Sequence, residues 1–181
     1  MTVPPYVIGT IMLLIFAHLS DRFKTRLYPI LIALVIDMIG LIMTITIPLS
    51  NTGGRYAGLV ILLAGTFIGS PLTVAWLSGN TPEPGKRTVV LGINGYGNLA
   101  GIIGSQIFLA RYGPSYRVPL GITLGLVGVS FCGYFLYGTT LRLVNRWKAK
   151  KVAAMTPEEI EEENTTEKRY ADRKYTFIYG L

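Results

Sequence analysis

Residues that could bind a solute lie along one stretch of an otherwise apolar segment, residues 88–110. Four small or polar residues fall at i, i+4, i+7 and i+11, the spacing of one helix face: Asn94, Asn98, Gly101 and Ser105. Amides and hydroxyls inside an apolar region need hydrogen-bond partners, so we expect this face to turn toward other helices or a wet cavity. The pattern has two interpretations: a path in which the amides hydrogen-bond a solute, or bonding between helices that holds a bundle together.

An acidic residue, Asp37, lies near the middle of a second apolar segment, residues 27–49. An ionised carboxylate at the centre of a membrane helix costs about 2.5–3.5 kcal/mol on insertion scales, so an acid at such a position is a candidate for proton exchange. The alternative is a protonated or hydrogen-bonded acid at a contact between helices. We therefore treat Asp37 as a candidate proton-coupling residue that also has this structural interpretation.

Charged residues of both signs lie just before that segment, in residues 21–26. The carboxylate of Asp21 could accept hydrogen bonds from Arg22 or Arg26, and those contacts would break if the helix ends moved apart. The loop would then act as a gate closed by a charge clasp. The alternative is a plain basic loop that sets the orientation of the neighbouring helices in a membrane.

Few residues of this chain could carry covalent or metal chemistry. His18 is the only histidine and Cys132 the only cysteine among 181 residues, which leaves no Cys/His metal set and no disulfide framework. No H-E-x-x-H, G-x-S-x-G or paired-carboxylate pattern is present. The net charge of +7 is not arranged as a basic stripe with interleaved aromatic residues. We therefore expect a protein that is not an enzyme, with no catalytic residues, metal, cofactor or nucleic-acid partner.

The candidate residues are set in five long apolar segments. Half of the residues are apolar, 15% are charged and the mean hydropathy is +0.45, which is unusual for a soluble domain. A bilayer core of ~30 Å needs about 20 apolar residues in a helix, and these runs are too continuous for barrel strands. The predicted spans are residues 3–20, 27–49, 55–79, 88–110 and 118–140. The predicted fold class is all-α, a polytopic helix bundle whose transmembrane region, residues 1–140, lies in the lipid bilayer.

The basic residues between the spans predict the orientation of the bundle. One side would carry only three of them, Arg55, Arg111 and Arg117. The other side would carry a much larger set: Arg22, Lys24, Arg26, Lys86, Arg87, Arg142, Arg146, Lys148, Lys150 and Lys151. Because loops rich in Lys and Arg stay inside the cell, the C-terminus is predicted to be cytoplasmic and the N-terminus outside.

Residues 141–181 predict a charged cytoplasmic tail. The sequence Thr156-Pro157-Glu158-Glu159 has the capping-box pattern, with proline at the first helical position, so a short acidic helix is expected to run through Glu163. The remainder mixes charges of both signs with tyrosines, and we expect it to be a solvated regulatory or trafficking segment.

Six short blocks of sequence carry a family resemblance. They occur in order over about residues 3–120: Val3–Tyr6, Ser20–Arg26, Ala75–Asn80 ahead of Gly85–Arg87, Gly97–Gly101 and Pro114–Tyr116. This pattern resembles the C-terminal half of the major facilitator superfamily. More narrowly, it is similar to the fungal allantoate-permease type of anion:cation symporter, a group that includes nicotinate, pantothenate and biotin carriers.

The resemblance implies a place and a role for several residues. The five spans would be helices eight to twelve of a twelve-helix carrier. Residues Asp21, Arg22 and Arg26 would belong to the second copy of the superfamily's G-x-x-x-D-R-x-G-R-R gating motif, with Ala17 and Lys24 where the motif has glycines.

The same resemblance implies which residues meet the substrate. Helices eight, ten and eleven line the central cavity of such carriers, whereas nine and twelve lie at the periphery. The implied substrate-binding residues are Tyr6, Trp76, Asn94 and Asn98, and Asp37 becomes a weaker candidate for proton coupling.

The implied function is part of a secondary active transporter in the plasma membrane. It would move small organic anions or vitamins, with a proton, by alternating access. Such a mechanism needs two halves that rock about a site at the midplane, so the missing N-terminal helices of the same carrier are an expected partner. The alternative is a truncated, non-transporting membrane fragment or accessory protein.

Overall fold

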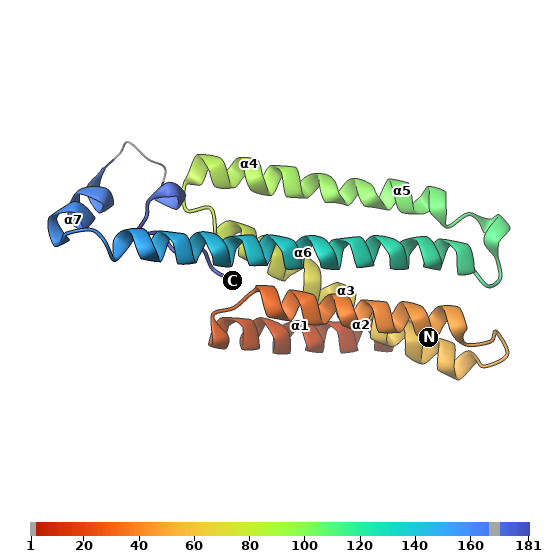
Figure 1. Ribbon diagram of the computed structural model, residues 1–181. Coiled ribbons are helices and arrows are strands. Elements are labelled where there is room, and N and C mark those ends of the chain that lie inside the picture. The colour runs from red at the N-terminus through yellow and green to blue at the C-terminus, as the bar shows by residue number, and fades with distance from the viewer. Residues whose placement is uncertain (1–2, 167–170) are drawn as a thin grey trace.

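The computed structural model describes residues 3–166 and 171–181, with Asn98 by its main chain only. The described residues form helices and connecting turns, with no strand among them. Five long helical elements, residues 3–23, 27–46, 52–79, 84–107 and 117–152, run roughly side by side, and a shorter helix follows (Figure 1). In chain order the α-helices are α1 (Val3–Phe23), α2 (Leu27–Thr46), α3 (Thr52–Gly79), α4 (Pro84–Gly95), α5 (Ala100–Ile107), α6 (Arg117–Val152) and α7 (Pro157–Thr165). The prediction of an all-α membrane helix bundle is confirmed.

Four of the described helices are long and apolar enough to cross a membrane: α1, α2, α3 and α6. The predicted span 88–110 differs, because α4 ends at Gly95 and a 3-10 turn, η1 (Tyr96–Leu99), separates it from α5. Glycine costs about 1 kcal/mol in a helix interior relative to alanine, and Gly95 and Gly97 flank the start of this turn. The path nevertheless continues in one direction along the bundle (Figure 1).

The closest packing is between α2 and α3, where glycines let the two main chains approach. A Cβ atom added at Gly40 would lie 2.5 Å from the Leu62 nitrogen. One added at Gly65 would lie 2.5 Å from Asp37 Oδ1 and 2.7 Å from the Ala33 carbonyl oxygen. No side chain larger than hydrogen fits at either position without a shift of the helices.

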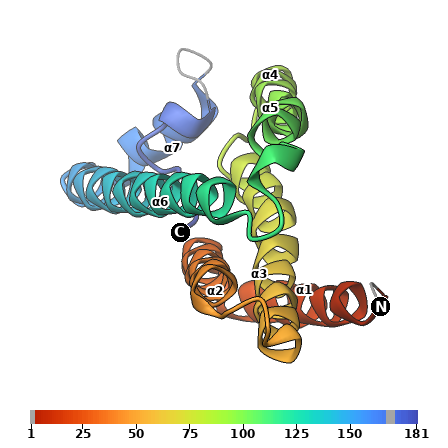
Figure 2. The ribbon, with the colours of Figure 1, turned by 90° about the vertical axis from the view of Figure 1, so that its right-hand side faces the viewer.

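The buried core joins α2, α3 and α6. Its members are apolar side chains at most 6% exposed: Leu27, Ile30, Ala33, Ile68, Leu72, Trp76 and Leu141. Large apolar side chains of α1 point outward instead, such as Leu14 at 64% exposed, as expected of a helix surrounded by lipid. By contrast, α4 and α5 stand apart from α1 and α2 in both ribbon views (Figures 1 and 2).

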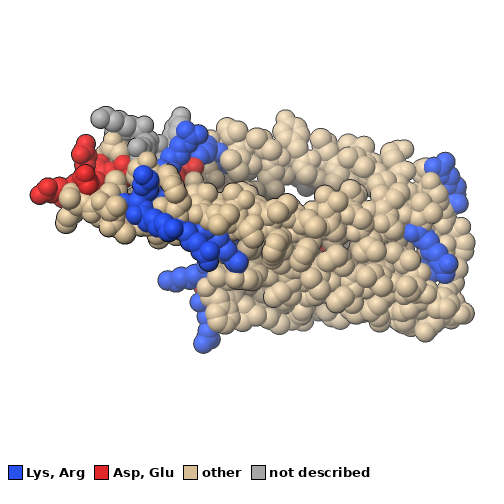
Figure 3. All heavy atoms as spheres, viewed as in Figure 1, with Lys and Arg blue, Asp and Glu red and all other residues tan. Residues whose placement is uncertain are grey.

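The last helix of the bundle is longer than a bilayer is thick. With 36 residues, α6 extends over about 54 Å, so its final turns must project beyond a ~30 Å apolar layer. We call the end of the bundle from which it projects the tail end; α1 and α3 also end there, and α2 and α4 begin there (Figure 1). Lysine and arginine side chains gather at this end, together with the acidic side chains of α7 (Figure 3).

The tail contains the predicted helix, but it is more ordered than expected. The Thr156 hydroxyl accepts from the Glu159 N–H, and the Glu159 carboxylate accepts from the Thr156 N–H, which completes the capping box of α7. Residues 171–181 then fold back onto the bundle in place of the solvated segment that composition had indicated. The reason is a set of side chains on α3 and α6 that bind this segment through its main chain.

Candidate functional site

A polar cavity of about 500 Å³ opens between α2, α3, α4 and α6. Its polar lining comes from all four helices: Asp37, Thr66, Ser70, Thr73, Asn94, Ser130 and Tyr134. Ile30, Leu34 and Val74 are among the apolar residues that complete the wall. The cavity therefore combines one carboxyl group with neutral hydroxyl and amide groups, a lining that suits a small polar solute.

Asp37 lies in this wall with 9% of its surface exposed. The Thr66 Oγ1 atom is 3.0 Å from Asp37 Oδ1 and also 3.0 Å from the Leu62 carbonyl oxygen. A hydroxyl has a single proton, so Thr66 can donate to only one of these acceptors at a time. If Asp37 is ionised, Thr66 donates to it; if Asp37 is protonated, the acid can donate to Thr66 while Thr66 donates to Leu62. The pair can thus hold the carboxyl group in either protonation state.

A second hydroxyl pair connects α3 with α6 in the same wall. The Thr73 and Tyr134 oxygens are 2.8 Å apart, and Thr73 Oγ1 is also 2.8 Å from the Gly69 carbonyl oxygen. Because the Gly69 carbonyl can only accept, the Thr73 proton points to it and Tyr134 donates to Thr73. The Tyr134 oxygen keeps its own lone pairs, which a donor group of a bound solute could use.

Of the four residues implied as substrate-binding, the three whose side chains the structure describes, Tyr6, Trp76 and Asn94, do not line one cavity. Asn94 lines the polar cavity, and the Asn98 side chain lies outside the described part of the structure. Trp76 is only 3% exposed, and its indole N–H donates to the Gly180 carbonyl oxygen at 2.8 Å. Its ring stacks on Tyr134 with centroids 6.1 Å apart, so Trp76 supports the cavity wall from behind.

Tyr6 lies on a different face of the molecule. It is 53% exposed on α1 and contacts Phe67 edge-on at 5.9 Å between ring centroids. It lines a shallow apolar groove of about 380 Å³ formed by one side of α1. The groove and the polar cavity share no lining residue among those described.

The loop predicted as a gate contains the ion pair expected of a charge clasp. An Arg26 guanidinium nitrogen lies 2.6 Å from Asp21 Oδ1. The Ser20 hydroxyl donates to the Thr25 carbonyl oxygen at 2.8 Å, and Lys24 adopts a left-handed conformation with φ 50°, so the turn is tight. Arg22 is exposed in the last turn of α1.

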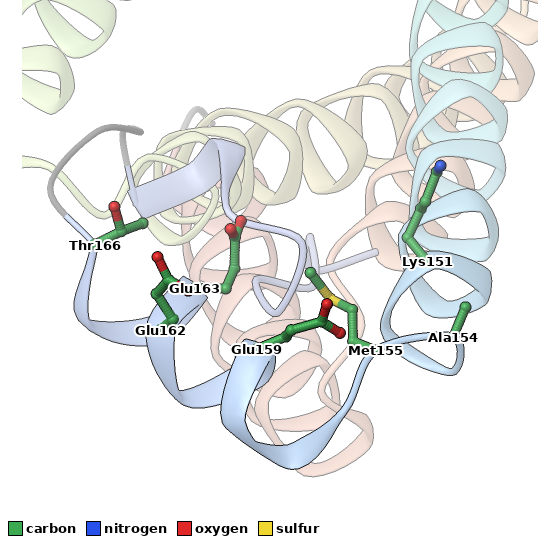
Figure 4. Close-up of a pocket in the computed structure, with 7 residues that line it drawn as sticks. All are labelled: Lys151, Ala154, Met155, Glu159, Glu162, Glu163 and Thr166. Atoms are coloured by element: carbon green, nitrogen blue, oxygen red, sulfur yellow. The ribbon is translucent and has the colours of Figure 1, made fainter.

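A further cavity of about 450 Å³ lies between the end of α6 and α7 (Figure 4). Glu159 in its wall belongs to the capping box, and Glu163 accepts from the Tyr175 N–H at 3.0 Å. These carboxylates therefore serve the folding of the tail. No group of three or more potential metal ligands occurs in the part of the chain that the structure describes.

Thr66, Thr73 and Tyr134 are functional candidates that the sequence analysis did not name. The sequence could have indicated a polar face on α3, because Thr66, Ser70 and Thr73 fall at i, i+4 and i+7 and so share one helix face. This is the same rule that singled out Asn94. Tyr134 had no such signal, since only the crossing of α6 over α3 brings its hydroxyl to Thr73.

The fold and cavity define an α-helical membrane protein with a polar site between its helices. Curated relatives agree with this class. The chain is 32% identical over 155 residues to the major facilitator-type transporter hxnP of Emericella nidulans, which covers 84% of this chain and 31% of that protein. It is 34% identical over 181 residues to the high-affinity nicotinic acid transporter of Saccharomyces cerevisiae, covering 99% of this chain and 33% of that protein.

An MFS-type transporter of Hormonema carpetanum, efuF, is 32% identical over 147 residues. The chain is thus related to major facilitator-type transporters, and it spans about a third of the length of the curated relatives it matches. These relatives are named as transporters, in agreement with the expectation that the protein is not an enzyme. No family model matches the chain, and no solved structure matches it.

Proposed function

We propose that this chain is the C-terminal part of a proton-coupled carrier for small organic anions or vitamins, with an allantoate-permease-type architecture. The observation that carries the proposal is the similarity to a nicotinic acid transporter along 99% of the chain. In this proposal the five long elements are helices eight to twelve of a twelve-helix carrier in the plasma membrane, with the tail end in the cytoplasm.

The lining of the polar cavity supports coupled binding of an anionic substrate and a proton. Asn94, Thr73 and Tyr134 offer neutral polar groups, and Asp37 is the carboxyl group beside them. An ionised Asp37 would repel a carboxylate substrate in this low-dielectric surrounding. Protonation of Asp37 removes the repulsion, so a proton and an anion would bind together, which is the basis of symport.

The remaining helices of the same carrier are the proposed partner of this chain. Alternating access requires two halves about a central site, and the chain matches about a third of each relative. Glycines along α4, η1 and α5 support the need for further helices, because a Cβ built at Gly95, Gly97 or Gly101 has no atom within 4 Å beyond the neighbouring residues of its own segment. Small residues of this kind are typical of helix–helix contacts in membranes.

Uptake of labelled nicotinate, pantothenate and allantoate tests the proposal. The assay uses cells that express a complete carrier containing this sequence. The variant Asn94→Ala/Asn98→Ala is expected to abolish uptake at unchanged surface expression. Thr46→Ala is a matched control, because the Thr46 hydroxyl bonds only main-chain oxygens of its own helix.

Unchanged uptake by the double variant would overturn the assignment of the amides to a substrate path. Absence of uptake for all three substrates by the complete carrier would overturn the substrate class. Cells expressing only the 181-residue chain serve as a comparison. Their uptake should equal the background, since half of the proposed site is absent.

A further inference from the structure

A peptide-binding site lies at the tail end, and residues 171–181 of the same chain occupy it. We propose that the ends of α3 and α6 form a site for an extended peptide, recognised through its main chain and through two aromatic rings. This inference goes beyond the proposed transport function and does not depend on it. Four features of the contacts carry it.

Two asparagines, Asn80 at the C-cap of α3 and Asn145 on α6, bind consecutive residues of the peptide. The Asn80 side chain accepts from the Gly180 N–H at 2.7 Å and donates to the Gly180 carbonyl oxygen at 3.1 Å. The Asn145 side chain does the same for Tyr179, at 2.9 Å and 2.8 Å. Each amide therefore satisfies both polar groups of one residue, as a neighbouring strand would.

A buried lysine fixes the aromatic residues of the peptide. Lys148 is 4% exposed, and its ammonium group donates to the carbonyl oxygens of Asp172 and Phe177 at 2.7 Å and 3.1 Å. It also lies 4.4 Å from the ring centroid of Tyr179 and 5.5 Å from that of Phe177. A buried cation is costly unless such groups surround it. The carbonyl oxygens and aromatic rings of the peptide therefore stabilise the buried ammonium group of Lys148.

Trp76 closes the site from the side of α3. Its indole N–H donates to the Gly180 carbonyl oxygen, the same oxygen that Asn80 binds. An indole N–H enclosed in a protein almost always has a partner. The Gly180 carbonyl oxygen therefore provides the hydrogen-bond acceptor for the buried Trp76 indole.

The two ends of the peptide reach the neighbouring elements. Near its start, the Ala171 N–H donates to the Glu83 carboxylate at 3.0 Å, and Asp172 pairs with Lys86 of α4. At its other end, the Leu181 main-chain oxygen accepts from the Arg26 N–H at 2.5 Å. The peptide thus links α3, α4 and α6 with the loop between α1 and α2, elements that Figure 2 shows on different sides of the bundle.

Trypsin digestion of the intact chain in detergent micelles tests whether these contacts hold the peptide. Cleavage after Lys174 reports the undocked fraction, and cleavage after Arg111, at the opposite end, reports the rest of the fold. Asn145→Leu removes both bonds to Tyr179 and should raise cleavage after Lys174 about tenfold, with no change at Arg111. Thr140→Val is the control, since the Thr140 hydroxyl bonds only Leu136 of its own helix.

Equal cleavage after Lys174 in Asn145→Leu and the unmodified chain would overturn the proposal. If cleavage rises at both positions, the fold itself has changed. Disulfide cross-linking then tests whether the peptide is docked. A Cβ at Gly180 would lie 3.6 Å from Asn80 Oδ1, so Asn80→Cys/Gly180→Cys in a Cys132→Ser background should cross-link under mild oxidation. Ser115→Cys/Gly180→Cys is the distant control pair. Failure of the first pair to cross-link, or equal cross-linking of both, would overturn the docked arrangement.

A peptide added from outside tests the site apart from its resident segment. Gly180→Pro removes the N–H that Asn80 accepts and leaves every residue of the site intact. A fluorescent peptide with the sequence of residues 171–181 should bind this variant at least tenfold more tightly than it binds Gly180→Pro/Asn145→Leu. Equal binding to the two chains would show that the site does not select the peptide, and would overturn the proposal.

Discussion

Thr66 Oγ1 lies 3.0 Å from Asp37 Oδ1, and the main chain of its own helix offers the same hydroxyl a second acceptor at the same distance. This relationship connects a buried acid on α2 with α3 through a group that can serve as donor or acceptor. A carboxyl group placed in this way can change its protonation state without losing its hydrogen bond. The first two predictions depend on this pair.

Thr66→Val should leave Asp37 without its side-chain partner while conserving the shape of the residue. A buried polar group that loses its hydrogen bond costs about 1–3 kcal/mol. The free energy of unfolding in detergent should therefore fall by about that amount. Thr46→Val provides the comparison, because its exposed hydroxyl bonds only its own helix. Equal stabilities of the two variants would contradict the role of Thr66.

Asp37→Asn should retain the size and hydrogen bonding of the protonated acid while removing the proton that can be exchanged. In a complete carrier, substrate binding should persist, whereas accumulation driven by a proton gradient should be lost. The measurements are equilibrium binding of labelled substrate and uptake with and without an imposed pH gradient. Gradient-driven uptake that survives the substitution would exclude Asp37 as the coupling group.

Gly65→Ala should force α2 and α3 apart, because the added methyl group would lie 2.5 Å from Asp37 Oδ1 and 2.7 Å from the Ala33 carbonyl oxygen. Overpacking of this kind costs about 1–3 kcal/mol. Gly69→Ala, one turn further along α3, meets no atom within 4 Å beyond the adjacent backbone of its own helix, and it should be neutral or stabilising by up to about 1 kcal/mol. Thermal unfolding of the two variants side by side tests the contrast, and a reversed order would refute it.

Tyr134→Phe should remove a hydroxyl from the cavity wall and keep the ring that stacks on Trp76. Loss of one hydrogen bond to a solute is worth about 1 kcal/mol, so KM for uptake by a complete carrier should rise about fivefold, and loss of the bond to Thr73 should lower the free energy of unfolding by about 1 kcal/mol. Tyr137→Phe tests the specificity of the effect. The Tyr137 ring also contacts Trp76, at 5.2 Å between centroids, but that residue does not line the cavity. A KM unaffected by Tyr134→Phe would remove this hydroxyl from the proposed site.

Hydropathy and the positions of polar breaks were sufficient to predict the helical class and most helix positions, because span length is set by bilayer thickness. The interruption at η1 (Tyr96–Leu99) was not predicted, since an apolar average over 88–110 is insensitive to a local run of glycines. The charge clasp in the loop between α1 and α2 depended on residues close in sequence, and the structure contains its Asp21–Arg26 pair.

The parts of the cavity and tail that sequence reasoning missed depend on contacts between distant residues. Tyr134 meets Thr73 across 61 positions of sequence, and Trp76 meets Gly180 across 104. Spacing within one helix carries no information about such pairs. Composition was also misleading for residues 171–181, because their binding uses main-chain groups that every residue except proline possesses.

The way Asn80 and Asn145 hold the peptide has a consequence for how this stretch of the protein can vary. Both amides contact only main-chain atoms of residues 179 and 180, so the amides themselves place little restriction on the side chains there, whereas the ring of Tyr179 is restricted by its contact with Lys148. The number of residues that separate residues 179 and 180 from Asp172 is strongly restricted, because Lys86 and Lys148 bind Asp172 at the other end of the peptide. The number of residues between Asp172 and Tyr179 is therefore more restricted than the side chain at position 180, because the insertion or loss of one residue would shift Tyr179 and Gly180 out of register with Asn145 and Asn80.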